Sequence, residues 1–125
     1  MTVLSLRNKR QQGQHYEAVA EDYLRRHGLL PCQRNFQCRS GEIDLIMRDR
    51  RCWVFVEVKF RKNNHYGSGA DAVNWRKQQR LKRAAFFWLQ KQGHAIEHTE
   101  FRFDVVSLTG EPPTIEWFTN TLVEG

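Results

Sequence analysis

The chain has 125 residues, of which 40% are hydrophobic and 12% aromatic, and 20 Lys and Arg side chains stand against 14 Asp and Glu. Domains usually contain about 100 to 200 residues, so this length predicts a single domain and excludes two large ones. The apolar content suffices to bury roughly two thirds of the surface of the unfolded chain, which excludes intrinsic disorder.

The net charge of +6 is distributed unevenly. Residues 1–93 carry 19 basic and 8 acidic side chains, whereas residues 94–125 carry 1 and 6. A basic body of this kind favours a polyanionic partner, nucleic acid first, although an ordinary basic protein would show the same balance. No stretch resembles a signal peptide or approaches the ~20 apolar residues of a membrane span, so we expect a cytoplasmic protein that does not enter membranes.

The three cysteines, Cys32, Cys38 and Cys52, are an odd number and lack the spacing of a zinc site. We interpret them as small buried residues of a protein in a reducing compartment.

A first helix is predicted over residues 14–27. Apolar side chains repeat there at the spacing of one helical face: Tyr16, Val19, Ala20, Tyr23 and Leu24. Gly28 ends the helix. Glu17 lies at the edge of this face, so its carboxylate is expected to look along the packed surface.

Three strands are predicted next, over residues 30–38, 42–48 and 52–60. The third places Val54, Val56 and Val58 on one face and Phe55, Glu57 and Lys59 on the other. Both faces begin with apolar residues, which is typical of a central strand covered on both sides.

A second helix is predicted over residues 71–92, with Asp71 as its N-cap and Gly93 beyond its end. Its apolar face contains Leu81, Ala84, Ala85 and Trp88, with Lys77 and Gln78 on the same side. A strand over residues 101–108 and a short edge strand over residues 114–118 complete the chain. The order α, β, β, β, α, β and a further β predicts an α/β fold with a mixed sheet and helices packed against it.

Glu57 and Lys59 interrupt the central strand, where a buried charge without a partner costs several kcal/mol. The hairpin register that pairs Ile43, Leu45 and Met47 with Val58, Val56 and Val54 also sets Asp44 opposite Glu57. Like charges in that position are destabilising unless a cation lies between them.

Two carboxylates held together suit a hard divalent cation, Mg²⁺ or Mn²⁺, that completes its shell with water and phosphate oxygens. Lys59 would then hold or activate an attacking water. The alternative is a structural ion pair of Lys59 with Glu57 or Asp44, and spacing alone does not decide between these readings.

The segments around these residues resemble the D…ExK core of the PD-(D/E)xK nuclease superfamily: Gly41-Glu42-Ile43-Asp44-Leu45-Ile46 and Val56-Glu57-Val58-Lys59-Phe60-Arg61. The chain resembles more closely the small bacterial YraN-type family, which is similar to archaeal Holliday junction resolvases. The likeness runs from Tyr16 to Val106. One departure is Ile43, which stands where the superfamily has proline, and it affects no ligand.

The resemblance implies a restriction-endonuclease-like fold and a metal-dependent DNA endonuclease that acts on branched or otherwise structured DNA in repair or recombination. It implies Asp44 and Glu57 as metal ligands, Lys59 as the catalytic lysine, and Glu17 as the first-helix acid that completes the site. Gln78 falls where relatives have a helix residue facing the site. The alternative is a DNA-binding or scaffold protein that keeps the fold without turnover.

Contacts to the nucleic acid are predicted for basic side chains at the end of the third strand and on the second helix: Arg61, Lys62, Arg76, Lys77 and Arg80. Trp75 is predicted to pack against the sheet, with stacking on an unpaired base as the alternative. Asp104, beside Arg102, is assigned a structural role. Resolvase-like chemistry on a two-fold junction would favour a homodimer.

Overall fold

A computed structural model describes residues 9–62 and 75–121. Its elements run in the order α1 (Lys9–Arg26), β1 (Leu30–Cys38), β2 (Gly41–Asp49), β3 (Cys52–Arg61), α2 (Trp75–Lys91), a 3₁₀ turn (Ile96–His98), β4 (Phe101–Thr109) and β5 (Thr114–Phe118). The predicted α/β order is confirmed. The predicted N-cap Asp71 lies outside the described residues.

The five strands form one mixed sheet in the order β1-β2-β3-β4-β5. β3 and β4 are parallel, and the other neighbouring strands are antiparallel. Parallel neighbours need a long crossover, and the segment that contains α2 provides it. The sheet order makes β3 the central strand, as predicted.

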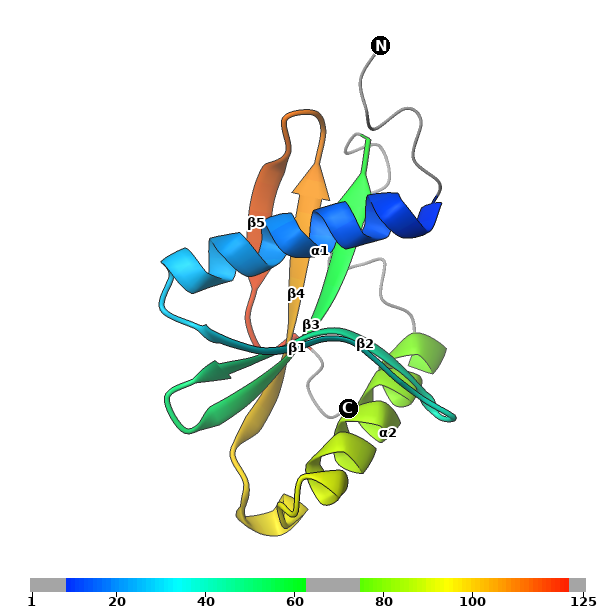
Figure 1. Ribbon diagram of the computed structural model, residues 1–125, viewed down its shortest axis with the longest axis vertical. Coiled ribbons are helices and arrows are strands. Elements are labelled where there is room, and N and C mark those ends of the chain that lie inside the picture. The colour runs from blue at the N-terminus through cyan, green and yellow to red at the C-terminus, as the bar shows by residue number, and fades with distance from the viewer. Residues whose placement is uncertain (1–8, 63–74, 122–125) are drawn as a thin grey trace.

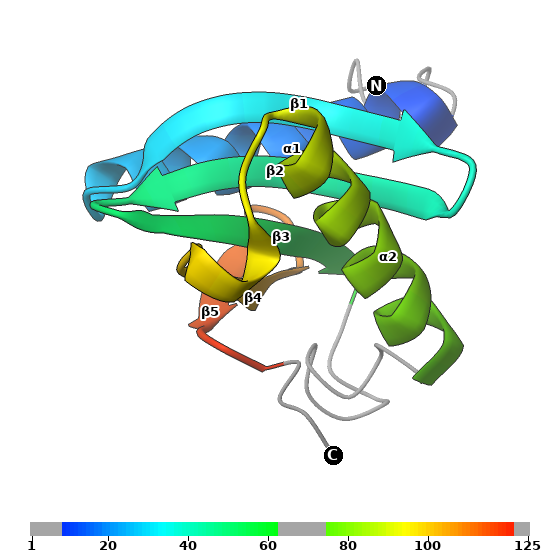
Figure 2. The ribbon, with the colours of Figure 1, turned by 90° about the horizontal axis from the view of Figure 1, so that it is seen from below.

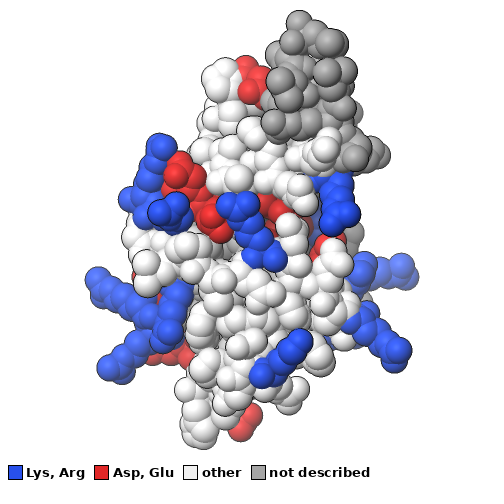
Figure 3. Space-filling model, viewed as in Figure 1, with Lys and Arg blue, Asp and Glu red and all other residues white. Residues whose placement is uncertain are grey.

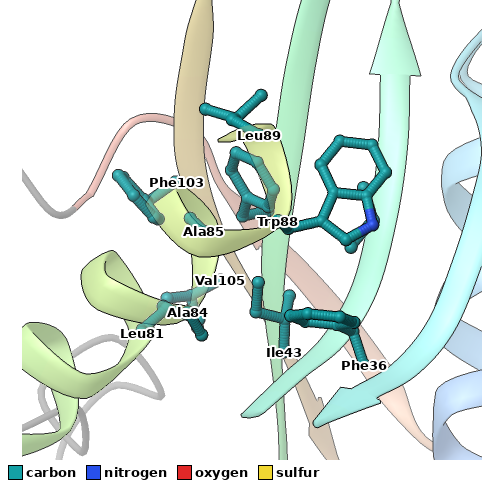
Figure 4. Close-up of a cluster of buried hydrophobic side chains, with 11 residues drawn as sticks. Phe36, Ile43, Leu81, Ala84, Ala85, Trp88, Leu89, Phe103 and Val105 are labelled. Carbon is teal, nitrogen blue, oxygen red and sulfur yellow. The ribbon is translucent and has the colours of Figure 1, made fainter. Parts of the chain in front are cut away.

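The two helices cover opposite faces of this sheet (Figures 1 and 2). On one face, Tyr16, Ala20 and Leu24 of α1 pack on a cluster that includes Leu45 and Val56. The other face carries α2, and Figure 4 shows its cluster of side chains: Leu81, Ala84, Ala85, Trp88 and Leu89 with Phe36, Ile43, Phe103 and Val105. The predicted apolar faces of both helices are therefore confirmed.

The side chains of β3 alternate between the two clusters. Val54 and Val56 are buried with α1, whereas Phe55 is buried with α2. Glu57 and Lys59 continue the alternation on the α2 face. On the face covered by α2, the central strand is thus apolar as far as Phe55 and then carries an acid and a base.

The structure corrects two expectations. α1 begins at Lys9, five residues before the predicted start, because its first two turns carry polar side chains that give no apolar period. All three cysteines have free thiols, but they are not buried as expected: Cys32 is exposed, and Cys38 and Cys52 are only partly buried. Among the described residues, neither helix is long and apolar enough to cross a membrane.

Candidate functional site

The site forms where the alternation of side chains between the two faces of the sheet is interrupted in the β1–β2 hairpin. Arg34 and Leu45 are paired across the hairpin, and Phe36 and Ile43 are the next pair described. Leu45 is buried against α1 but Ile43 against α2, although residues two apart in a strand normally share a face. Asn35, between Arg34 and Phe36, has a φ of +52°, a conformation that asparagine tolerates better than most residues. The expectation that Ile43 shares a face with Leu45 is therefore wrong.

This interruption places Asp44 at the point where the hydrogen-bonded ladder between β2 and β3 ends. Their ladder runs from Asp49–Cys52 to Leu45–Val56, as the predicted register requires, and stops before Asp44 and Glu57. Beyond it, the backbone N–H of Val58 donates to Oδ2 of Asp44 at 2.8 Å. The Asp44 side chain thus takes the place of a ladder bond and is held next to Glu57.

Glu57 is 5% exposed and is partnered by two lysines. The ammonium group of Lys59 lies 3.3 Å from its Oε1 atom, and the ammonium group of Lys77 forms an ion pair with the same oxygen. Lys59 comes from the same strand and Lys77 from the beginning of α2. Two ammonium groups, one from β3 and one from α2, thus share one oxygen of the acid on the central strand.

Glu17 approaches from α1, on the opposite face of the sheet. Its side chain is buried, with 8% of the residue exposed, and its Oε1 atom has no hydrogen-bond partner. Burial raises the pKa of Glu17, while hydrogen bonds with Asn35 and Asp44 lower it in part. A buried carboxylate oxygen without a donor is costly unless something else, such as a cation or a water, binds it.

Burial and the charge of Glu57 raise the pKa of Asp44 to about 8, against a small opposing contribution from the Val58 N–H. The pKa of Lys59 is lowered by burial and by Lys77. Burial also lowers the pKa of Lys77, but its pairing with Glu57 outweighs this and the net shift is upward. The negative charge at the site therefore exceeds what the surrounding protein stabilises well.

Two hollows meet at these carboxylates. The first, which we call the inter-helix hollow, has a volume of about 480 Å³ and lies between α1, β2, β3 and α2. Its lining includes Glu17, Asp44, Glu57, Lys77 and Arg80. A second hollow of about 560 Å³ lies on the β1 side and shares Gly13, Glu17, Glu42 and Asp44 with the first. Glu17 and Asp44 thus line both hollows, whereas Glu57 lines only the inter-helix hollow.

The structure brings the predicted site residues together to different degrees. Asp44 interacts with both Glu57 and Glu17, and Lys59 lies beside Glu57. From α2, Lys77 forms an ion pair with Glu57. The role predicted for Gln78, the next residue along α2, stays a prediction.

Of the residues predicted to contact nucleic acid, Lys77 and Arg80 line the inter-helix hollow. Arg61 ends β3, exposed Lys62 follows it, and Arg76 is exposed at the start of α2. On the face seen in Figure 3, Lys and Arg side chains are spread around the rim with acidic side chains between them. The described residues therefore form no continuous basic surface on this face.

Sequence reasoning missed Asn35 and Glu42 and misplaced Trp75. Asn35 influences Glu17, and Glu42 lines both hollows. An asparagine inside a predicted strand was the available signal, because asparagine is depleted in strands. Trp75 is 70% exposed, so the expectation that it packs against the sheet is wrong.

Asp104, by contrast, belongs to a structural network away from the site. It is fully buried and accepts hydrogen bonds from Arg102 Nε at 3.1 Å, Trp117 Nε1 at 2.9 Å and the backbone N–H of Asn120 at 2.8 Å. Arg102 also donates to Asp49 at 3.0 Å. The network joins β4 to β5, to the segment after β5 and to the end of β2.

The oxygen donors of the site fit a hard divalent cation in their chemistry. Glu17 offers a buried, unpartnered oxygen, and the raised pKa of Asp44 marks an unmet need for positive charge. Within the described ranges, however, no three acidic, histidine or cysteine side chains converge closely enough to hold a metal. Mg²⁺ usually takes only one or two protein carboxylates and retains waters, so a third ready-made ligand is not required.

The comparisons with known proteins agree on a single family. Residues 16–108 match the sequence model described as "Uncharacterised protein family UPF0102". A UPF0102 protein of Photobacterium profundum is 72% identical over 118 residues, covering 94% of each chain. One from Aliivibrio salmonicida is 51% identical over 94% of this chain and 96% of its own, and one from Yersinia pseudotuberculosis is 48% identical over 90% and 95%. The matched segment contains all the carboxylates and lysines of the site.

Proposed function

The chain belongs to the UPF0102 family, whose description assigns no activity, and we propose from its own residues that it is a metal-dependent endonuclease that hydrolyses phosphodiester bonds in DNA. The observation that carries this proposal is that Asp44 lies beside the buried carboxylates of both Glu57 and Glu17, with Lys59 next to Glu57. The three carboxylates come from three different elements and meet at a hollow that opens to solvent.

Asp44 and Glu57 are the residues that would hold Mg²⁺ or Mn²⁺, with Glu17 binding a water or a second ion. When bound, such an ion would polarise the scissile phosphate and lower the pKa of a bound water. Lys59 would orient the attacking water and offset negative charge in the transition state. The Val58 N–H holds the orientation of Asp44 by donating to its Oδ2 atom.

The substrate that we propose is branched or otherwise structured DNA, in repair or recombination, following the resemblance to Holliday junction resolvases. Lys77 and Arg80 in the hollow would pair with phosphates, and exposed Arg76 and Lys62 would extend the contact. A two-fold branched substrate would be served best by a homodimer, which light scattering with and without a four-way junction would test.

The proposal is tested by incubating the protein with duplex, single-stranded, flap and four-way DNA in Mn²⁺ or Mg²⁺. We expect cleavage of at least one substrate and a loss of at least ~100-fold in Glu57→Gln, as is usual when a group that stabilises the transition state is removed. Glu116→Gln, an exposed acid on β5, is the matched control and should cleave at the wild-type rate. Failure to cleave any substrate, or equal cleavage by Glu57→Gln, would remove the enzyme proposal.

A second candidate function is DNA binding without turnover. The observation that favours it is that two ammonium groups, those of Lys59 and Lys77, already neutralise Glu57. Binding would then fall steeply with salt and be unaffected by EDTA. Fluorescence anisotropy with labelled four-way DNA, measured with Mg²⁺ and with EDTA, separates this function from the catalytic one when it accompanies the cleavage assay.

A further inference from the structure

Two positive charges converge on one carboxylate oxygen at the centre of the site. Lys59 and Lys77 both approach Oε1 of Glu57, and each perturbs the pKa of the other. Two ammonium groups repel each other, so an arrangement that holds both near one oxygen needs strong negative charge around it. Glu57 supplies most of that charge, and Asp44 adds to it at Lys77.

The two lysines together supply the same positive charge as one divalent cation. Buried carboxylates that have lost their hydration need a counter-charge in every state of the protein, including the one without metal. The ammonium groups meet this need in the structure described here. A divalent ion that entered the site would make one of them superfluous, and its charge would repel both.

The lysines differ in how readily they can leave. The side chain of Lys59 is 19% exposed and extends from the central strand, whereas that of Lys77 is 42% exposed and extends from the third residue of α2. Lys77 lines the inter-helix hollow together with Arg80, so another position in the same hollow is open to its long, flexible stem. Lys77 is therefore the group that can be displaced.

We propose, building on the proposed function, that Lys77 is a displaceable counter-ion: it neutralises Glu57 while no divalent cation is bound, leaves Glu57 when the cation binds, and then pairs with a substrate phosphate in the inter-helix hollow. Lys77 is thus a positioning residue that couples the two binding events. Metal binding frees the cation that the phosphate needs, and phosphate binding draws Lys77 away from the metal ligand.

The first test compares Mn²⁺ binding to the wild type and to Lys77→Met by isothermal titration calorimetry without DNA. Removal of a competing positive charge a few ångströms from the ion should tighten the apparent dissociation constant by about tenfold. Arg83→Met removes a charge from an exposed position on the same helix and should leave Mn²⁺ affinity within about twofold, as for a screened surface charge. Lys77→Gln repeats the measurement with a polar side chain should the Met variant fold poorly.

A second readout uses the unmutated protein. An amine-reactive acylating reagent followed by mass spectrometry should label Lys77 at least twofold faster with Mg²⁺ than with EDTA, while the labelling of Lys91 at the far end of α2 stays unchanged. With Ca²⁺ in place of Mg²⁺ to suppress cleavage, Lys77→Met should bind four-way DNA several-fold more weakly than Arg83→Met.

The outcomes separate this inference from the proposed function. If the wild type binds Mn²⁺ and Lys77→Met binds it equally or more weakly, or if labelling of Lys77 ignores Mg²⁺, the counter-ion role is wrong and the nuclease proposal stands. If neither protein binds Mn²⁺, both are wrong. If only Lys77→Met binds Mn²⁺, Lys77 blocks the site and is not displaced by the cation, so the displaceable counter-ion role is wrong and the metal-dependent proposal fails for the wild type.

Discussion

Asp44 is the acidic side chain whose surroundings disfavour its charge most clearly. Burial and Glu57 raise its pKa to about 8, whereas an aspartate in an unfolded chain titrates near ~3.9. Between these values the folded protein holds a proton that the unfolded chain has released. The free energy of unfolding therefore falls progressively as pH rises from about 4 to about 8, because only the unfolded chain has released this proton. Above that window Asp44 is ionised in both states, and the loss of stability is fully present.

The first prediction is that Asp44→Asn is more stable than the wild type, by a margin that grows from pH 5 to pH 8. Asparagine can still accept from the Val58 N–H and carries no charge to oppose Glu57. Urea unfolding at pH 5, 6, 7 and 8 measures the margin. A variant less stable than the wild type at pH 8 would identify Asp44 as a structural partner of the lysines instead.

The second prediction follows from the proposed metal site. A ligand that binds only the folded state stabilises it by about 2.7 kcal/mol at 100 times its dissociation constant. Mg²⁺ or Mn²⁺ should therefore raise the Tm of the wild type by several degrees, and Asp44→Asn should lose most of this rise. Differential scanning fluorimetry measures the shift, and Glu116→Gln should retain it in full.

Elements, rather than residues, decide how the carboxylates meet. α1 presents Glu17 from one face of the sheet, β3 presents Glu57, and α2 presents Lys77 from the other face. The helices can place these groups only if they lie close to the sheet, and Gly41 marks a close approach of α2 to β2. Gly13 lies within α1 beside both hollows, and Gly41 begins β2 beneath α2.

The third prediction concerns Gly13, whose added Cβ would meet no atom within 4 Å. Glycine in a helix costs about 0.5–1 kcal/mol relative to alanine, so Gly13→Ala should raise the free energy of unfolding by that amount. Chemical denaturation measures the gain. Gly93→Ala is the contrasting control, because Gly93 has a φ of +84° and the same change there should destabilise the protein.

The fourth prediction concerns Gly41, where an added Cβ would lie 2.8 Å from the backbone carbonyl oxygen of Arg80. Backbone atoms of a packed helix cannot move aside easily, so Gly41→Ala should cost about 1–3 kcal/mol, as overpacking does. It should also shift α2 and reduce the proposed cleavage activity. Unchanged stability would mean that α2 does not pack as closely on β2 as described.

At the scale of the whole molecule, Asp104 ties the second half of the sheet together. Its carboxylate serves Arg102, Trp117 and Asn120, which lie on β4, on β5 and after β5. The hydrogen bonds to this buried carboxylate connect β4, β5 and the segment after β5, which a short edge strand alone would connect only weakly. The far side of the sheet from the site thus depends on one polar network.

The fifth prediction is that Asp104→Ala destabilises the fold by about 3–5 kcal/mol, because the Nε–H of Arg102 and two further N–H donors lose their acceptor, and the positive charge of Arg102 keeps only Asp49 as a partner. Thermal and urea unfolding measure the loss. Glu116→Ala, an exposed acid on the adjacent strand, should change stability by less than about 0.5 kcal/mol. A loss below about 1 kcal/mol in Asp104→Ala would show that water replaces the network.

The sequence by itself determined the order of the elements, the central position of β3 and the apolar faces of both helices. These features depend on local periodicity, and the alternation through Val54, Phe55 and Val56 repeats often enough to be unambiguous. The register of β2 on β3 followed from the same alternation as far as Leu45. The acidic pair Asp44 and Glu57 stood out because charges are expensive on a covered strand.

Only the tertiary structure decided which groups surround that pair. The change of face at Asn35 and Asp44, the ion pair of Lys77 with Glu57, and the approach of Glu17 depend on contacts between elements far apart in the chain. On a helix, adjacent residues differ by about 100° in direction, so the sequence alone leaves two or three candidates for the α2 residue that faces the site. The packing angle of α2 on the sheet selects one of them, and that angle is set by side-chain fit and by Gly41, which no local period encodes.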